Sequence, residues 1–296
     1  MPDRFFTQDA FHKGFGREMV SANDVYDARS KSGMKEYSLA QYDFIFIADQ
    51  QDKLERLGKF LSENYGYTIR AVTPIEGLYE LTGDATEFPV DEDNLMYWAL
   101  DLYCKGYEFD CRLDGYGASG DPQDQQFTDL APALYDQYFE LAMDAYNKRN
   151  LGMAAIHFST AIKINPNDPD SWYSRAIVKD ELHTWKAARR DYDKAIELAP
   201  DFTSAILNRA ANKDEAGEYQ AAIDDYTFVI GLEPQNEMAY FNRGNSKLNL
   251  KDTKGACADW HKAQELGDDH AAERIAQHCH NQSGLKDKLL GLFKRN

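Results

Sequence analysis

A 34-residue period in the second half of the chain is the feature that most restricts its fold. Four windows align without a gap: 135–168, 169–202, 203–236 and 237–270. Their eighth position is small in every window: Ala142, Ala176, Ala210 and Gly244. Small residues at a fixed position allow two helices to approach closely. Each window therefore predicts one helix-turn-helix unit, and neighbouring units would bury their apolar faces against each other.

Aromatic and proline positions recur with the same period. The twenty-fourth position is aromatic in all four windows: Phe158, Tyr192, Tyr226 and Trp260. The thirty-second is occupied in order by Pro166, Pro200, Pro234 and Asp268. Proline ends the second helix of a unit because it cannot continue one. This pattern resembles the tetratricopeptide repeat (TPR) family, and the resemblance implies an all-α TPR solenoid over residues 135–270.

Residues 271–296 follow the repeats as a predicted capping helix and a basic amphipathic tail. AAERIAQHCHNQ would cover the last apolar face of the solenoid. Beyond it, four apolar residues lie at helical spacing among basic ones: Leu285, Leu289, Leu292 and Phe293. Such a tail suits a membrane surface, a partner or the solenoid itself. We favour packing on the solenoid because the tail is short and the rest of the chain is acidic.

Arginine and aspartate occur together in three of the four windows. The seventh position is Leu141 in the first window and arginine in the others, and the twenty-third is His157 in the first and aspartate in the others. The predicted pairs are Arg175 with Asp191, Arg209 with Asp225 and Arg243 with Asp259. Each would join the two helices of one hairpin. A structural role is expected, since three copies of one active site would make little sense.

TPR arrays, which this region resembles, bind partners on the face formed by the first helix of each repeat. The predicted partner-binding residues on that face are apolar residues and amides: Phe139, Tyr173, Ile177, Leu207, Asn208, Phe241, Asn242 and Asn245. The basic clamp of chaperone-binding arrays is missing, since Tyr173 and Ser204 stand where lysines are expected. An apolar or basic helix or an extended segment fits better. The alternative for each residue is contact with a neighbouring repeat.

Residues 42–120 alternate between strand and helix patterns. YDFIFIAD is aromatic and β-branched, and the segment after it carries apolar residues on one helical face up to Gly66. Two further strands precede a helix that Gly106 would end, and FDCRLDGYG gives a last strand with a tight Asp-Gly-Tyr-Gly turn. The order β-α-β-β-α-β predicts an α+β, ferredoxin-like sandwich.

Asp114, Gly115 and Tyr116 lie at the end of that last strand. With the order of elements, they resemble the ribonuclease E inhibitor family RraB, small acidic bacterial proteins in which Asp-Gly-Trp follows the second helix. The resemblance covers about 42–117, with Tyr116 in place of the tryptophan. It implies inhibition of an RNA-degrading endonuclease by protein contact, without catalytic residues or a cofactor. The segment 1–41 is an N-terminal extension without a clear pattern, and 121–134 reads as a linker.

Acidic residues are concentrated in the N-terminal part of the chain. The net charge of the 296 residues is −17, and residues 1–134 hold 12 Lys and Arg against 25 Asp and Glu. This balance argues against direct nucleic-acid binding, because phosphates would be repelled, and favours a basic protein partner. Asp91, Glu92 and Asp93 are the predicted acidic contacts. Their alternative role is to stabilise a helix N-terminus.

The four cysteines are Cys104, Cys111, Cys257 and Cys279, and they show no framework spacing. No signal peptide and no apolar run of membrane-span length is visible, so we expect a cytoplasmic protein with reduced thiols. Cys257 and His261 are zinc-binding residue types, but no recognised ligand spacing accompanies them. No metal and no cofactor is predicted.

Catalytic motifs do not stand out in the chain. It has no glycine-rich phosphate loop, no G-x-S-x-G and no nucleophile with an evident base. The sequence therefore predicts a non-catalytic protein that regulates or inhibits a partner through protein–protein contacts. Two alternatives stay open: an immunity protein that neutralises a cognate toxin, and an enzyme with a TPR appendage. The enzyme would need a pocket with converging carboxylates of perturbed pKa. Asp110 and Asp114 are four residues apart on the last predicted strand, hence on one face, but two carboxylates alone specify no reaction.

Overall fold

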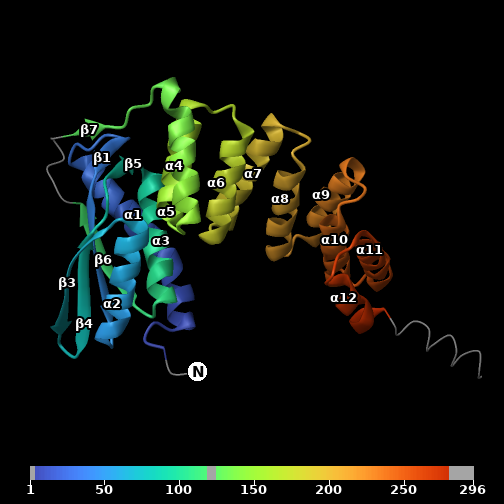
Figure 1. Ribbon diagram of the computed structural model, residues 1–296, viewed down its shortest axis with the longest axis horizontal. Helices are drawn as coiled ribbons and strands as arrows, with labels where there is room; N and C mark the ends of the chain where they lie inside the picture. The colour runs from blue at the N-terminus through green and yellow to red at the C-terminus, as the bar shows by residue number, and fades with distance from the viewer. Residues whose placement is uncertain (1–3, 119–124, 280–296) are drawn as a thin grey trace, which may run out of the picture. The chain divides into compact units, whose positions relative to one another are not determined.

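The computed structural model describes residues 4–118 and 125–279, which divide between Thr184 and Trp185 into two compact units. The first unit combines β-sheets with helices, and the second is helical throughout its described part (Figure 1). The first predicted hairpin and the first helix of the second belong to the first unit. The predicted linker falls partly, at 121–124, outside the described residues.

An antiparallel sheet with the strand order β3-β4-β2-β6 lies in the first unit. Its strands are β2 (Tyr42–Ala48), β3 (Thr68–Ile75), β4 (Leu78–Asp84) and β6 (Arg112–Ala118). Along β2, Tyr42, Phe44 and Phe46 alternate with less buried residues and are fully buried themselves. Side chains of a strand point alternately to opposite faces, so these aromatics place the core on one face of the sheet.

Two helices from the predicted αβ pattern cover the buried face. They are α2 (Gln51–Phe60), which runs into the π-helical turn η1 (Leu61–Tyr65), and α3 (Glu92–Glu108). Trp98 of α3 is the centre of the core: its ring lies 5.5 Å from Tyr42, 5.7 Å from Phe88 and 5.5 Å from Tyr116. Large aromatic side chains of this kind supply much of a core's buried area.

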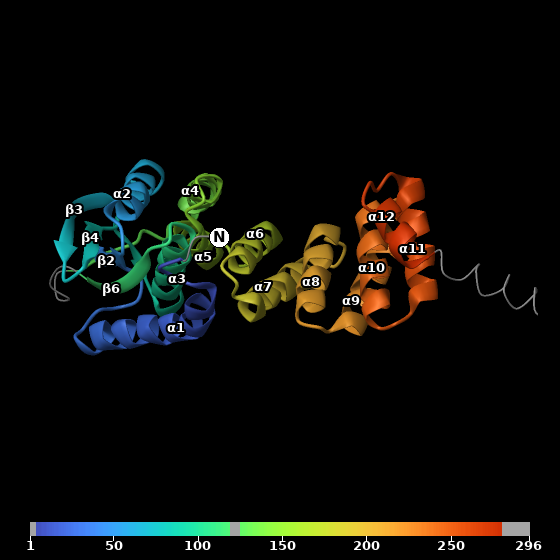
Figure 2. The ribbon, with the colours of Figure 1, turned by 90° about the horizontal axis from the view of Figure 1, so that it is seen from below.

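The N-terminal extension contains the long helix α1 (Gln8–Lys31), which lies along α3 (Figure 2). Tyr103 of α3 donates a hydrogen bond to the carbonyl of Phe11 at 3.0 Å. Gly14 leaves room for this tyrosine, because a Cβ there would lie 2.1 Å from its hydroxyl oxygen. A second, small sheet of order β5-β1-β7 follows, built from β1 (Ser38–Ala40), β5 (Phe88–Val90) and β7 (Gln126–Phe127).

Two local predictions around FDCRLDGYG are wrong. Gly106 does not end its helix but lies inside α3, where a Cβ would be 2.7 Å from the Cys111 carbonyl oxygen. The chain turns instead at Asp110, which has a φ of 61°. Asp-Gly-Tyr-Gly is not a turn: Ile45 pairs with Gly115 and Phe46 with Leu113, so Asp114 is the extra residue of a β-bulge within β6.

The first helical hairpin shares the core of the first unit. It follows a 3₁₀ turn, η2 (Pro132–Leu134), and comprises α4 (Tyr135–Asn147) and α5 (Leu151–Ile164), before α6 (Pro169–Glu181). One cluster of buried residues runs from Phe6 to Leu182. α5 packs on α3 at Gly152, where a Cβ would lie 3.0 Å from the Trp98 Cα. The hairpin is therefore joined to the α/β part rather than separated by a free linker.

The second unit continues the 34-residue pattern with helix pairs. Its helices are α7 (Trp185–Leu198), α8 (Thr203–Glu215), α9 (Tyr219–Leu232), α10 (Glu237–Asn249), α11 (Thr253–Leu266) and α12 (Ala271–His278). The small residues predicted at close helix–helix contacts are tightly packed. Ala210, Ala222 and Ala256 are fully buried, and a Cβ added at Gly244 would lie 2.6 Å from the Trp260 Nε1. The helical repeat region is thus TPR-like, and α12 lies where the capping helix was predicted. The predicted amphipathic tail lies outside the described residues.

Candidate protein-binding surfaces

Arginine–aspartate contacts fix the hairpins of the second unit. Arg209 donates to both carboxylate oxygens of Asp225, at 2.9 and 2.8 Å, and Arg243 does the same to Asp259, at 2.8 and 2.7 Å. A lysine one turn further on also contacts each aspartate, Lys213 on Asp225 and Lys247 on Asp259, both at 2.7 Å. Two of the three predicted pairs are therefore present, as charge-assisted networks.

The same arginines also reach the preceding hairpin. Arg209 donates to Asp193 at 2.7 Å and Arg243 to Thr227 at 3.1 Å. In the first unit, Arg175 makes the equivalent contact with Ser159 at 3.0 Å. Each arginine therefore links two repeats. Asp191, the predicted partner of Arg175, is buried in the second unit, so the two residues of this predicted pair belong to different units.

The predicted face of the first unit consists of half-buried side chains. Phe139 packs edge-to-face on Phe158, with ring centroids 5.4 Å apart, so much of its surface serves the core. Tyr173 and Ile177 lie one helical turn apart on α6 and both are half-buried. Tyr146 of α4 donates to Glu181 at 2.5 Å and lies near Tyr173. This face therefore offers aromatic surface bordered by carboxylates.

In the second unit, the predicted residues come from α8 and α10. Leu207 packs against the clusters around Ile206 and Tyr226, and its neighbour Asn208 is half-buried. On α10, Phe241 packs against the last core cluster. Asn242 and Asn245 lie one turn apart on the same helix and are also half-buried. These residues thus combine packing with a partly open surface.

Asn245 carries an unusual feature on this face. Its side-chain Oδ1 is buried and accepts no hydrogen bond from any of residues 4–118 and 125–279. A buried acceptor without a donor costs free energy, of the order of 1–3 kcal/mol. Asn245 is four residues after Phe241, so the two residues lie on the same face of α10.

The three predicted acidic contacts have different roles. Asp91 is the N-cap of α3, because its carboxylate accepts the backbone N–H of Asn94 at 2.6 Å, and burial raises its pKa. Glu92 and Asp93 are exposed in the first turn. The pKa of Tyr26 is raised by burial and then by the charges of Glu36, Asp91, Glu92 and Asp27. These four carboxylates, with Asp93, form one acidic patch.

Sequence reasoning missed part of this patch. Asp27 belongs to α1 and Glu36 precedes β1, and both lie in the extension that had no clear pattern. Their approach to α3 depends on the packing of α1, which is visible only in the structure. The available signal was the spacing of two exposed acids on α1, Asp24 and Asp27, which are three residues apart.

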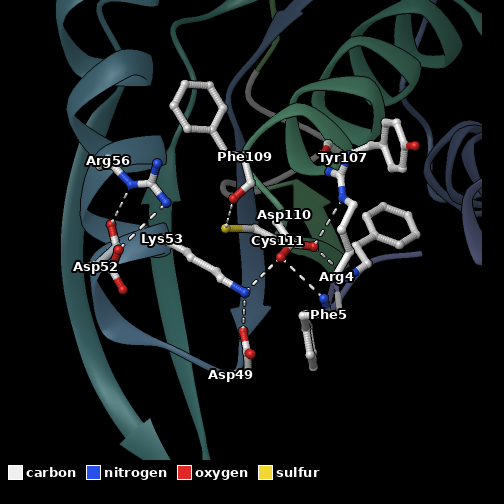
Figure 3. A network of polar contacts seen from close by, with 11 residues as sticks. Arg4, Phe5, Asp49, Asp52, Lys53, Arg56, Tyr107, Phe109, Asp110 and Cys111 are labelled. Carbon is white, nitrogen blue, oxygen red and sulfur yellow. Dashed lines mark hydrogen bonds and ion pairs between the residues drawn. The ribbon is translucent and has the colours of Figure 1, made fainter. Parts of the chain in front are cut away.

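Asp110 is the centre of a polar network that anchors the N-terminal segment (Figure 3). It accepts the backbone N–H groups of Phe5 at 3.2 Å and Phe6 at 2.8 Å, and Lys53 Nζ lies 2.7 Å away. Lys53 also contacts Asp49 at 2.7 Å. Burial alone would raise the pKa of Asp110, but these hydrogen bonds outweigh it and lower the pKa.

The possible pairing of Asp110 with Asp114 finds no support in this geometry. Asp110 lies in the turn before β6, and Asp114 lies in the bulge, bound to Arg112 at 3.1 Å. Gly115 and Tyr116 follow in the strand. The Tyr116 ring packs on Trp98, and burial raises the pKa of its hydroxyl. Tyr116 is thus packed against the core, whereas the Asp114 side chain is exposed.

Two cavities of the first unit each have a single carboxylate in their lining. One, of about 660 Å³, is lined by Glu55, Lys59 and neighbouring residues between η1 and β3. Another, of about 250 Å³, includes Glu108, whose carboxylate binds Lys105 at 2.8 Å. Asp101 is buried away from both: burial raises its pKa to about 7, although Lys105, Tyr65 and the Gly152 N–H oppose this.

Cys257 and Cys279 form a disulfide, so the expectation of reduced thiols is wrong for this pair. Cys104 and Cys111 are free thiols. Within the two described ranges, no three His, Cys, Asp or Glu side chains are grouped so that they could hold a metal ion. In the same part of the chain, no helix has both the length and the apolar character needed to cross a membrane.

Comparison with known proteins gives weak likenesses at the level of the fold. No family model and no curated protein matches the chain. Among solved structures, residues 41 to the end of MamA from Desulfovibrio magneticus RS-1 are 17% identical, with a TM-score of 0.49, over 54% of this chain and 92% of that one. YrrB, titled a TPR protein with an unusual peptide-binding site, is 19% identical, with a TM-score of 0.46, over 60% and 82%. The Arabidopsis OM64 TPR domain is 25% identical, with a TM-score of 0.36, over 41% and 94%.

Proposed function

We propose that this protein is a non-catalytic interaction protein that regulates or inhibits a basic protein partner, such as an RNA-degrading nuclease. The first unit would supply an acidic surface, and the face of α8 and α10 would hold an extended or helical segment. Two modest contacts on one chain raise affinity through effective concentration. A cytoplasmic site of action and the absence of catalysis are parts of this proposal.

The observation that carries the proposal is the orphaned Oδ1 of Asn245 on the same face of α10 as Phe241. A bound polypeptide would cover the phenylalanine ring with an apolar side chain, and rotation of the half-buried Asn245 side chain would let it accept a backbone N–H from the same polypeptide. Main-chain hydrogen bonds of this kind bind extended segments largely independently of their sequence, and side-chain contacts add specificity. Asn242, one turn away, offers a second amide on the same helix.

The proposed contribution of the first unit rests on charge and topology. With β2, β3, β4 and β6 taken as strands one to four, the sheet order reads 4-1-3-2 from β6 to β3, which supports a ferredoxin-like arrangement. The acidic patch around Glu36, Glu92 and Asp93 suits a basic surface. The resemblance to RraB suggests that the protein with this basic surface is a nuclease. Folds of this type serve many functions, so the partner must be found by experiment.

The test is capture of the partner from a native cytoplasmic extract by the full-length protein. Asn245→Leu is the first variant, because it keeps a similar size but removes the amide, and Asn249→Leu is its control on an exposed position of the same helix. We expect the partner to be retained by the wild type and the control and lost with Asn245→Leu. Purified partner should then show reduced RNA cleavage when the protein is added.

Three results would change the proposal. Equal capture by Asn245→Leu and wild type would remove the α10 face from it. A captured partner without nuclease activity would remove the RNA-degrading target, and a captured toxin encoded beside this protein would favour the immunity alternative. Turnover of a substrate by the purified protein alone would contradict the non-catalytic role.

A further inference from the structure

The disulfide Cys257–Cys279 ties the last helix of the described chain to the helix before it. Cys257 lies in α11 and Cys279 is the C-cap of α12, with their Cα atoms 5.8 Å apart and a separation of 22 positions in sequence. Both cysteines are half-buried, so a small reductant can approach them. The bond closes the chain around the end of the last hairpin.

α12 has few other attachments. It contains eight residues, a length at which an isolated helix is marginal in water, and only Ala271 and Ile275 of it are buried. Asp268 fixes its start by accepting the N–H groups of His270 and Ala271, at 2.9 and 2.8 Å. The C-terminal end of α12 is held by the ring of His278, 5.6 Å from that of Trp260, and by the disulfide.

The surface beneath α12 is apolar and would need a cover. Trp260, Ala263 and Ala256 of α11 are fully buried in a cluster to which α12 contributes Ala271 and Ile275. A helical solenoid requires a cap on its terminal repeat because its end face is as apolar as the faces between repeats. His270, at the start of α12, also lies 6.2 Å from the ring of Phe241. Release of α12 would therefore change both the end face and the edge of the α10 surface.

We propose that Cys257–Cys279 is a reversible redox latch that controls the capping of the solenoid by α12. A dithiol reductant would supply two electrons and two protons: the S–S bond breaks to two thiols while the dithiol closes to its own disulfide. In the reduced protein α12 is held by the buried Ala271 and Ile275, by the ring contacts of His270 and His278 and by Asp268 at its start, and it opens more often than in the oxidised protein. Oxidation restores the closed cap. The opening and closing of α12 do not depend on binding of the proposed partner.

Hydrogen exchange of the full-length protein tests the latch. The amides of residues 271–279 should exchange slowly in the oxidised protein and faster by a factor on the order of a hundred in dithiothreitol, because the bond restrains a 22-residue segment. Amides of α8 and α9 should be unchanged. Cys279→Ser should exchange quickly under both conditions. Cys104→Ser, which removes a free thiol in the other unit, should behave as wild type.

Trypsin cleavage after Arg274, inside α12, provides a second readout. Cleavage should accelerate on reduction and slow again after reoxidation with oxidised glutathione. Exchange and cleavage that are equal in the oxidised and reduced protein would overturn the proposal. So would free thiols at both positions after incubation with the oxidant. If Cys279→Ser reduces the stability of the whole unit, the reduced wild-type chain still gives the comparison.

Discussion

Arg209 and Asp225 meet through two parallel hydrogen bonds, and the same guanidinium reaches Asp193 in the preceding hairpin. This contact explains a detail of the sequence pattern. The first hairpin has Leu141 and His157 at the corresponding positions, and α5 there packs on α3 instead of on a preceding repeat. The arginine is thus present in the hairpins that follow another repeat, to which it can be joined.

Arg209→Ala should destabilise the second unit by roughly 1–3 kcal/mol, because it leaves the largely buried Asp225 with Lys213 as its remaining cationic partner. Urea unfolding followed by circular dichroism measures this loss. Arg190→Ala is the matched control, since Arg190 is exposed on α7. The double variant with Asp225→Asn should lose less than the two single changes added together. Additive losses would show that the pair does not act as a unit.

The sequence predicted those parts of the fold that follow from local periodicity. Positions 7 and 23 are conspicuous because they recur in the repeats. Within one hairpin, the sixteen-residue spacing is enough to bring Arg243 to Asp259. The αβ order was readable because YDFIFIAD and the acidic start of α3 are strong local signals. The half-buried state of Leu207 and Phe241 is also in keeping with residues that serve both packing and a surface.

Other features depend on contacts between distant segments and could not be read locally. α1 contains Gly14 and Gly16, and of its residues only Phe11 and Ala22 are buried, so its apolar stripe is weak. The small sheet uses strands of two or three residues, which are too short for an alternation signal. The disulfide joins cysteines brought together by the cap, and spacing alone does not indicate it.

Gly152→Ala should test how firmly the first hairpin is joined to the α/β part. The new Cβ would lie 3.0 Å from the Trp98 Cα and 3.1 Å from the Asp101 Cβ, so α5 must move away from α3. Overpacking of this kind costs about 1–3 kcal/mol, and the loss should appear as a lower midpoint of urea unfolding for the first unit. Gly231→Ala in α9, where a Cβ meets nothing within 4 Å, should be neutral or stabilising. Equal behaviour of the two variants would contradict the close α3–α5 contact.

Asp101→Asn should change how stability depends on pH. Burial raises the pKa of Asp101 from 3.8 to about 7, so the folded protein keeps the proton longer than the unfolded chain. The stabilisation that results is complete below pH 3.8 and is lost as the pH rises towards 7. The asparagine variant does not ionise and should gain relative to wild type, by at most about 4 kcal/mol at pH 8.

Unfolding in urea at pH 4.5 and pH 8 measures this difference. The variant should be close to wild type at the lower pH and more stable at the higher one. Asp52→Asn, at an exposed position of α2, should show the same small effect at both. A difference between Asp101→Asn and wild type that does not vary with pH would show that the carboxyl titrates normally.

The acidic patch should act on the rate of association with a basic partner. Glu92→Lys with Asp93→Lys is the informative reversal, because both residues are exposed whereas Asp91 caps α3 and its loss would disturb the fold. We expect slower association and a weaker dependence on salt, since exposed charges are screened within about 10 Å at 0.1 M ionic strength. Phe241→Ala should instead speed dissociation, because its apolar contact forms only after docking. Stopped-flow binding of the captured partner at several salt concentrations separates the two effects.

Reversal of the charges of Asp201 and Glu215 to lysine controls for net charge, because both residues are exposed in the second unit. Association that slows equally in both double variants would assign the steering to overall charge and not to the patch.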